Sequence, residues 1–177
     1  MPKDNTKVKP TLRNAKPLKQ LDEKDRLILR LLQENSRISQ TELARRVNLT
    51  TPGLQKRLKK LEENGFIDRY VTLVNREALG LDLLCFTQVT LAHHHPECVG
   101  QFCEQVQDLP EVLECHHLTG EFDYLLKVVV SNHQHLQRFL TEKITQIPGV
   151  DKVRTNIVLN EIKASTSLPL NEEVKYS

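Results

Sequence analysis

Four basic side chains lie within one stretch of five residues: Lys56, Arg57, Lys59 and Lys60. Between and beside them, Leu54, Leu58 and Leu61 recur at the spacing of one helix face. At about 100° per residue, the three lysines then point away from this apolar face and Arg57 lies on its flank. Lysine and arginine bind phosphate oxygens, so this helix predicts a contact with DNA. A solvated basic face on a small helical bundle is the alternative.

A very short turn separates this basic helix from the one before it. Ser39 and Glu42 form a capping box that predicts the start of the first helix, and its end is predicted at Asn48. Thr51 as N-cap and Pro52 in the first turn predict the start of the second. Two helices joined in this way are typical of a helix-turn-helix, whose second helix enters the major groove of double-stranded DNA. The predicted DNA contacts are Thr51, Pro52, Gln55, Lys56, Arg57, Lys59 and Lys60, with Arg45 and Arg46 from the first helix.

Position along the helix divides these contacts by role. Gln55 and Lys56 lie near the N-terminal end of the second helix, so they are the predicted base readers. For Arg57, reading a base and clamping the backbone both stay open. The predicted phosphate contacts are Lys59, Lys60, Arg45 and Arg46.

Charge is divided unevenly along the chain, although the net charge is only +2. Residues 1–20 carry six Lys and Arg against one Asp, net +5, and residues 21–65 carry ten against seven acidic residues, net +3. Residues 66–177 carry nine against fifteen, net −6. A basic N-terminal end favours a polyanionic partner there. The first twenty residues, with three prolines and no apolar periodicity, predict a disordered basic tail.

A second group of candidate binding residues forms a predicted turn between two strand-like segments: Thr119, Gly120, Glu121, Phe122 and Asp123. Gly120 allows a carboxylate to approach backbone N–H groups closely, and Glu121 or Asp123 can meet an ammonium group. A carboxylate and an ammonium group together make an amino acid. From the spacing alone, a plain tight hairpin in which Gly120 supplies a positive φ is the more frequent case. Both interpretations stay open on the spacing.

Histidines and cysteines raise the question of a metal site or of catalysis. The run His93, His94 and His95 matches no zinc pattern, and three consecutive side chains cannot all reach one ion. His116 and His117 are adjacent on a predicted strand and therefore face opposite sides of the sheet. No nucleophile motif, phosphate loop or pair of carboxylates accompanies them. We therefore expect no metal site, no catalytic residue, no cofactor and no enzymatic activity.

Composition bears on the compartment. The four cysteines form no CxxC pair and lie in apolar segments, which favours buried thiols in a reducing compartment. No apolar run approaches the length of a membrane span, and the N-terminal residues lack the apolar centre of a secretory signal. The expectation is a cytoplasmic protein with no membrane partner.

The elements that must position these residues fall into two groups. Apolar periodicity predicts three helices within residues 21–65, the first capped by Asp22, and then a strand over residues 66–73. Further strands are predicted over residues 83–91, 112–118, 124–130 and 150–163, with a helix after the first of these and another after the third. This order, βαββαβ, is a ferredoxin-like split sandwich, and the predicted fold class is α+β.

Domain boundaries follow from these elements. We predict a disordered basic tail at residues 1–20, a helix-turn-helix domain at 21–65, a strand and hinge linker at 66–82, a βαββαβ domain for effector binding and oligomerisation at 83–168, and a C-terminal tail at 169–177. The strand over residues 83–91 is apolar on both faces, with Leu84 and Phe86 on one and Cys85 and Val89 on the other. Helices cover only one face of such a sheet, so we expect a second copy of the chain on the other. A dimer also presents two recognition helices to a pseudo-palindromic operator.

Separated stretches of the chain, from about residue 21 to residue 168, resemble the Lrp/AsnC family of leucine-responsive or feast/famine regulators. They are LDEKDRLILRLLQENSRIS, TELARRVNLTTPGLQKRLKKLEENGFI, ECHHLTGEFDYLLKV and PGVDKVRTNIVLNEIK. The resemblance implies an N-terminal winged helix-turn-helix and a C-terminal βαββαβ domain of the RAM or ACT-like type. It also implies dimers that often assemble into tetramers or octamers.

The same resemblance assigns the two sites. It places the recognition helix on residues 51–60 and the effector loop on Gly120, Glu121, Phe122 and Asp123, directly after Thr119. It implies that this loop faces Asn156, Ile157 and Val158 of the same or a neighbouring subunit, and that the effector is an amino acid. The basic tail, the run at His93 to His95 and the pair His116 and His117 depart from the family pattern.

Taken together, these features predict a sequence-specific DNA-binding transcription regulator whose DNA binding or assembly responds to an amino acid such as leucine. A regulator of the same fold that responds to cysteine, thiol state or a metal is the alternative. A small-molecule-binding enzyme or storage protein is a remote one. The effector, the operator, the direction of regulation and assembly beyond the dimer stay open.

Overall fold

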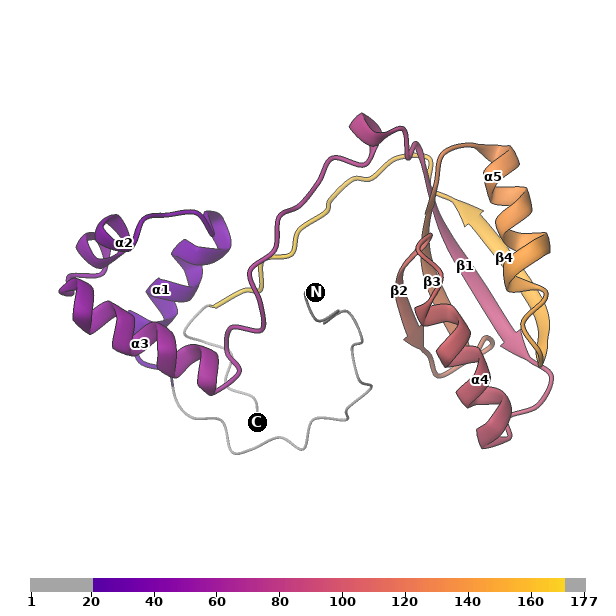
Figure 1. Cartoon of the computed structure of the whole chain (residues 1–177), viewed down its shortest axis with the longest axis horizontal. Helices are drawn as coiled ribbons and strands as arrows, with labels where there is room; N and C mark the ends of the chain where they lie inside the picture. The colour runs from indigo at the N-terminus through magenta and orange to yellow at the C-terminus, as the bar shows by residue number, and fades with distance from the viewer. Residues whose placement is uncertain (1–20, 171–177) are drawn as a thin grey trace, which may run out of the picture. The chain divides into compact units, whose positions relative to one another are not determined.

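The computed structural model describes residues 21–170, which divide into two compact units (Figure 1). The helical unit comprises residues 21–73 together with 163–170, and the sheet unit comprises residues 74–162. The predicted basic tail at residues 1–20 lies outside the described residues, as do residues 171–177 of the predicted C-terminal tail.

Two of the three helices in the helical unit start at the predicted caps. α1 (Glu23–Glu34) follows Asp22, whose carboxylate accepts a hydrogen bond of 2.8 Å from the N–H of Asp25. α2 (Gln40–Arg46) follows Ser39, whose hydroxyl accepts from the N–H of Glu42 at 3.2 Å. Each cap satisfies an N–H that the first turn of a helix leaves unpaired, so both predictions are confirmed.

α3 (Thr51–Glu63) has a different cap from the predicted one. The prediction of Thr51 as N-cap is wrong by one residue: Thr50 has the extended backbone, and its hydroxyl accepts from the N–H of Gly53 at 3.3 Å. A capping side chain accepts from the N–H of the second or third residue after it. Two consecutive threonines have the same side chain, so the sequence alone does not say which one is the cap. Pro52 remains in the first turn, where its missing N–H costs nothing.

An apolar core joins the three helices, and residues 163–170 extend it. Its buried members are Ile28, Leu29, Leu43, Ala44, Val47, Leu54 and Leu61. Leu170 packs against this core. The Gln33 side chain donates to the carbonyl of Leu168 at 3.2 Å and accepts from its N–H at 2.6 Å. Residues 163–168 thus lie in the compact helical unit of the structure, where Gln33 satisfies both main-chain groups of Leu168.

Residues 66–82 contain none of the predicted strand. Tyr70, Val71 and Leu73 are exposed, and no β-pairing within the described chain involves residues 66–73. A strand needs a neighbour to complete its ladder of N–H and C=O groups, and an alternating sequence alone does not supply one. A single helical turn at Glu77–Leu79, ended by Gly80 at φ 72°, leads into the sheet unit.

The sheet unit confirms the predicted βαββαβ order (Figure 1). Its elements are β1 (Leu83–Leu91), α4 (Pro96–Gln107), β2 (Val112–His117), β3 (Tyr124–Val130), α5 (His133–Arg138), which continues as a π-helical turn (Phe139–Ile144), and β4 (Val150–Ile157). The strands form one antiparallel sheet in the spatial order β2-β3-β1-β4. β4 ends before the predicted residue 163 because Ile157 already pairs with Cys85, close to the start of β1. Beyond that point the N–H of Val158 still donates to the carbonyl of Leu84, and β1 itself begins at Leu83.

The two faces of the sheet differ as predicted. Cys85, Val89 and Leu126 point into a core that includes Phe102 of α4 and Phe139 after α5, so both helices cover one face. Phe86 points to the other face and is 37% exposed. β1 is therefore apolar on both faces while helices cover only one.

Candidate functional site

The exposed face of α3 brings together most of the predicted DNA contacts. Exposed on it are Pro52, Gln55, Lys56, Lys59 and Lys60, while Thr51 and Arg57 are partly buried. Leu54 and Leu61 on the opposite side are buried in the helical core. Ammonium groups on an exposed helix face can approach phosphate oxygens without a change in the fold.

Gln55 is oriented by a residue that sequence reasoning missed. Its Nε2 atom donates to Oε1 of Gln40, the first residue of α2, at 3.0 Å. The pair thus links the two helices of the helix-turn-helix and leaves Oε1 of Gln55 available to accept from a donor outside the protein. Fifteen residues separate the two glutamines, so periodicity within one helix gives no signal for this contact.

Arg57 lies between α3 and α1 rather than on the outward face. Its Nη1 atom is 2.6 Å from Asp22 Oδ2 and 2.7 Å from Asp25 Oδ1. The Asp25 side chain is only 7% exposed, so its charge requires a partner. The hydrogen bonds that Arg57 donates to Asp22 and Asp25 raise its pKa above the ordinary value of a guanidinium. The structure places this guanidinium in a contact that holds α3 against α1.

Arg45 and Arg46 share one carboxylate on α2. Glu42 accepts from Arg45 at 2.8 and 2.9 Å and from Arg46 at 2.8 Å. These hydrogen bonds lower the pKa of Glu42 to about 2. The predicted capping box is therefore half formed: Ser39 caps the helix, but the Glu42 side chain orients the two arginines. Both remain exposed at the surface of the helical unit.

The predicted effector turn connects β2 to β3 at one end of the sheet. The N–H of Leu118 donates to the carbonyl of Asp123 at 2.8 Å, and the N–H of Asp123 donates to the carbonyl of Val89 at 3.1 Å. Gly120 has φ 132°, a conformation that side-chain-bearing residues rarely adopt, and no atom lies within 4 Å of the position a Cβ would take. The turn is therefore pinned at its base and open above Gly120.

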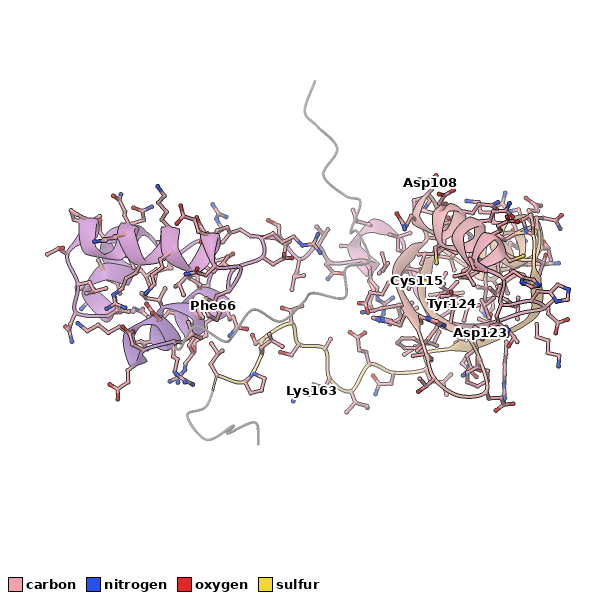
Figure 2. All side chains as sticks on the ribbon, turned by 90° about the horizontal axis from the view of Figure 1, so that it is seen from below. Phe66, Asp108, Cys115, Asp123, Tyr124 and Lys163 are labelled. Atoms are coloured by element: carbon pink, nitrogen blue, oxygen red, sulfur yellow. The ribbon has the colours of Figure 1, made fainter. Side chains whose placement is uncertain are left out.

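Asp123 is labelled in Figure 2, next to Tyr124 in the sheet unit. Both oxygens of its carboxylate accept hydrogen bonds. Oδ2 accepts from the N–H of Leu91 at 2.7 Å, and Oδ1 lies 2.7 Å from Nε2 of His94. Burial alone would raise the pKa of Asp123, but the hydrogen bonds from Leu91 and His94 and the charges of His94 and His117 outweigh it and lower this pKa. Asp123 is thus ionised at neutral pH and offers a fixed negative charge beside the turn.

The second half of the predicted effector site lies elsewhere on the same sheet. Asn156 pairs with Phe86, Ile157 pairs with Cys85, and the N–H of Val158 donates to Leu84. The turn instead adjoins the other end of β1, at Val89 and Leu91. At about 3.3 Å per residue, these two ends of β1 are separated by roughly 10–20 Å. Within one chain the structure does not bring the two groups together.

The adjacent histidines on β2 each have a local partner. His116 Nε2 is 3.0 Å from Glu114, and the His117 ring stacks on Tyr124 at 4.9 Å. Burial raises the pKa of Cys85, which disfavours its reactive thiolate form. Within residues 21–170, no group of three or more His, Cys, Asp or Glu side chains is placed to hold a metal ion. No helix in the same range is long and apolar enough to cross a membrane.

Comparison with known proteins identifies both units. Residues 21–68 match the family described as winged helix-turn-helix DNA-binding, and residues 84–168 match the Lrp/AsnC ligand binding domain. The leucine-responsive regulatory proteins of Klebsiella pneumoniae and Escherichia coli strain K12 are each 41% identical to this chain over 153 residues, which cover 86% of this chain and 93% of each relative.

Solved structures agree with the sequence matches. A transcriptional regulator of Neisseria meningitidis in complex with L-Met gives a TM-score of 0.83 at 38% identity, covering 86% of this chain and 98% of that one. An AsnC family transcriptional regulator from Agrobacterium tumefaciens gives a TM-score of 0.80 at 35% identity, covering 85% and 97%. These are regulators, not enzymes. A helix-turn-helix with an exposed basic face, a four-stranded βαββαβ unit and relatives that match over nearly their whole length lead to one conclusion: this chain belongs to the Lrp/AsnC family of DNA-binding transcription regulators.

Proposed function

We propose that this regulator senses an apolar amino acid at the turn formed by residues 119–123 and reads DNA with the exposed face of α3. The observation that carries the effector proposal is the fixed, ionised Asp123 beside the open space above Gly120. A backbone open at Gly120 suits the carboxylate of an amino acid, and Asp123 or Glu121 suits its ammonium group. Relatives named for leucine and a neighbour bound to L-Met support an apolar amino acid.

The effector site is completed by a second subunit in this proposal. The turn and residues Asn156, Ile157 and Val158 adjoin opposite ends of β1, so one chain does not hold one small molecule between them. An amino acid extends over far less than the separation of these ends. The turn of one protomer would therefore meet the last strand of another.

Dimerisation is proposed to use the face of the sheet that the helices leave uncovered. Phe86 is 37% exposed there. Gln88, two residues further along β1, has a buried Oε1 atom with no hydrogen-bond partner in the described chain. A buried oxygen without a donor costs free energy, and a second copy of the chain would supply both an apolar surface and a donor.

DNA recognition in this proposal divides between reading and anchoring. Gln55, held by Gln40, and Lys56 are the base readers, while Lys59, Lys60, Arg45 and Arg46 bind phosphates. Arg57 keeps α3 in place through its two carboxylates. An amino acid bound at a subunit contact changes the assembly or the spacing of recognition helices, and operator affinity changes with it.

A thermal-shift screen of the twenty amino acids tests the effector proposal. Wild-type protein is expected to be stabilised by L-leucine, L-methionine or another apolar amino acid, because a ligand that binds the folded state raises the melting temperature. Asp123→Asn is expected to lose this response, and Glu104→Gln, an exposed carboxylate on α4, to keep it. No response of the wild type to any amino acid would contradict the proposal.

A further inference from the structure

His94 already contacts the carboxylate oxygen of Asp123 that the ammonium group of the proposed amino acid would bind. Its Nε2 atom lies 2.7 Å from Asp123 Oδ1, while Asp123 Oδ2 is already bound by the N–H of Leu91. An ionised carboxylate only accepts hydrogen bonds, so the His94 nitrogen is the donor. The main-chain bond at Oδ2 belongs to the fold. Oδ1 is therefore the oxygen at which an incoming ammonium group and His94 meet.

The charge of His94 decides how strongly it repels an ammonium group bound at the same carboxylate oxygen. A neutral imidazole shares a carboxylate oxygen with an ammonium group without repulsion, because an oxygen has two lone pairs. An imidazolium places a second positive charge within a few ångströms of the ammonium group. Histidine is the side chain whose charge ordinarily changes near pH 6.5. His94 is also well placed to exchange protons, because its side chain is 67% exposed.

Other titratable groups around Asp123 do not occupy Oδ1. His93 and His95 flank His94, with their ring centroids 6.2 Å apart. His117 acts on Asp123 through its charge, and its ring stacks on Tyr124. The Tyr124 hydroxyl accepts from the Cys103 thiol at 3.9 Å, and Glu121 is exposed in the turn. Cys115 lies on the neighbouring strand β2. Among the groups of residues 21–170, the side-chain hydrogen bond to Asp123 comes from His94.

We propose that His94 is a specificity-determining residue of the effector site, which makes amino-acid binding at Asp123 release a proton. The inference rests on the proposed function, because it needs an ammonium group to bind at Asp123. A neutral His94 tolerates the ammonium group beside it. A protonated His94 competes with the ammonium group for Oδ1. The chain then responds to an amino acid and to pH together.

Isothermal titration of the full chain with L-methionine and with L-leucine, at pH 8.0 and at pH 5.8, tests this inference. Wild type is expected to bind more weakly at pH 5.8, by about three- to tenfold, because one proton must leave for each amino acid bound. Repeating the titration at intermediate pH in two buffers with different ionisation enthalpies counts the released protons. His94→Gln keeps a hydrogen-bond donor but has no group that changes its charge in this pH range. The affinity of this variant for the amino acid is therefore expected to be independent of pH. His93→Gln is the matched control and is expected to keep the pH dependence.

Three results overturn the inference, and they differ in what else they affect. Equal wild-type affinity at the two pH values, with no proton released, overturns the role of His94 and leaves the effector site standing. A pH dependence of affinity that persists in His94→Gln also overturns the role of His94 alone, because another group then carries the proton. Binding of neither amino acid at either pH overturns the proposed effector chemistry, and the inference with it. If the His94→Gln variant does not fold, the absence of a released proton from the wild type still overturns the inference.

Discussion

Arg57 differs from the neighbouring lysines because its guanidinium is already bound inside the protein. Periodicity correctly predicts that Lys56, Lys59 and Lys60 point outward, since helix geometry alone sets that direction. It does not predict the partners of Arg57. Asp22 and Asp25 lie 35 and 32 residues away along the chain and meet Arg57 only when α1 packs on α3. Local spacing therefore predicts exposure well and long-range polar contacts poorly.

Arg57→Ala is expected to destabilise the helical unit by about 1–3 kcal/mol, because it leaves the buried carboxylate of Asp25 without a cation. The value lies below that of a fully buried pair because Arg57 is 30% exposed. Lys59→Ala is the control. Its contact with Glu63 is 3.8 Å long and exposed, so a change within about 0.5 kcal/mol is expected. Urea unfolding measures both, and equal effects would contradict the structural role of Arg57.

Glu111 makes a second buried contact, and it predicts a pH dependence of stability. Its Oε1 atom accepts from Lys143 at 2.5 Å and from His135 at 3.3 Å, and the side chain is 9% exposed. Burial alone would raise the pKa of Glu111, but the hydrogen bonds from Lys143, its own backbone and His135 outweigh it and lower this pKa. A carboxylate whose pKa is lowered on folding stabilises the protein above its unfolded pKa, near 4.5, and loses that contribution as the pH falls through the lowered value.

Glu111→Gln is accordingly expected to cost about 1–3 kcal/mol in the free energy of unfolding at pH 7 and clearly less at pH 3.5. Urea denaturation at the two pH values checks this. Glu104→Gln, at an exposed position on α4, is the control. Its free energy of unfolding is expected to differ from that of the wild type by the same small amount at both pH values. A constant difference between wild type and Glu111→Gln from pH 7 to pH 3.5 would refute the argument.

Helix starts show where local chemistry is sufficient to predict an element and where it is not. Asp22 and Ser39 were predictable as caps because one polar residue stands before each helix. Thr50 and Thr51 are alike, so the choice depended on which hydroxyl reaches the N–H of Gly53. The strand predicted at residues 66–73 failed for another reason: alternation describes side chains, while a strand is held by main-chain partners that this chain does not offer there.

The position of the cap at α3 is testable. Thr50→Ala is expected to lower the free energy of unfolding by about 1 kcal/mol, because the N–H of Gly53 loses its acceptor. Thr50→Ser keeps the hydroxyl and is expected to be close to neutral. Thr51→Ala changes no cap and is expected to stay within about 0.5 kcal/mol. A larger loss in Thr51→Ala than in Thr50→Ala would show that the helix starts one residue later.

A single chain does not bring together all the residues of the proposed effector site. The βαββαβ order and the uncovered face of the sheet were both predictable, since β1 is apolar at consecutive positions. The effector residues were grouped by resemblance, yet the fold places them at opposite ends of β1. The proposed contact between subunits leaves no periodicity in the sequence, so its geometry was beyond prediction.

Phe86→Glu is expected to convert the proposed dimer into a monomer, because it places a charge in the proposed interface. Sedimentation velocity measures the mass, and circular dichroism confirms that the variant is folded. Gln101→Glu adds the same charge to an exposed position on α4 and is expected to leave the mass unchanged. A folded Phe86→Glu variant with wild-type mass would rule out this face as the interface.

The central claim, that the exposed face of α3 binds DNA, is tested most directly by fluorescence anisotropy on the DNA upstream of the protein's own gene. Wild type is expected to bind with an affinity that falls steeply as salt rises, because phosphate contacts release counterions. Lys56→Ala with Lys59→Ala is expected to abolish specific binding and to reduce the salt slope by about 1–2, with the oligomer intact. Arg138→Ala with Lys163→Ala removes the same charge elsewhere and is expected to bind like the wild type. Salt-dependent binding that is equally strong in the Lys56 and Lys59 double variant would contradict the account.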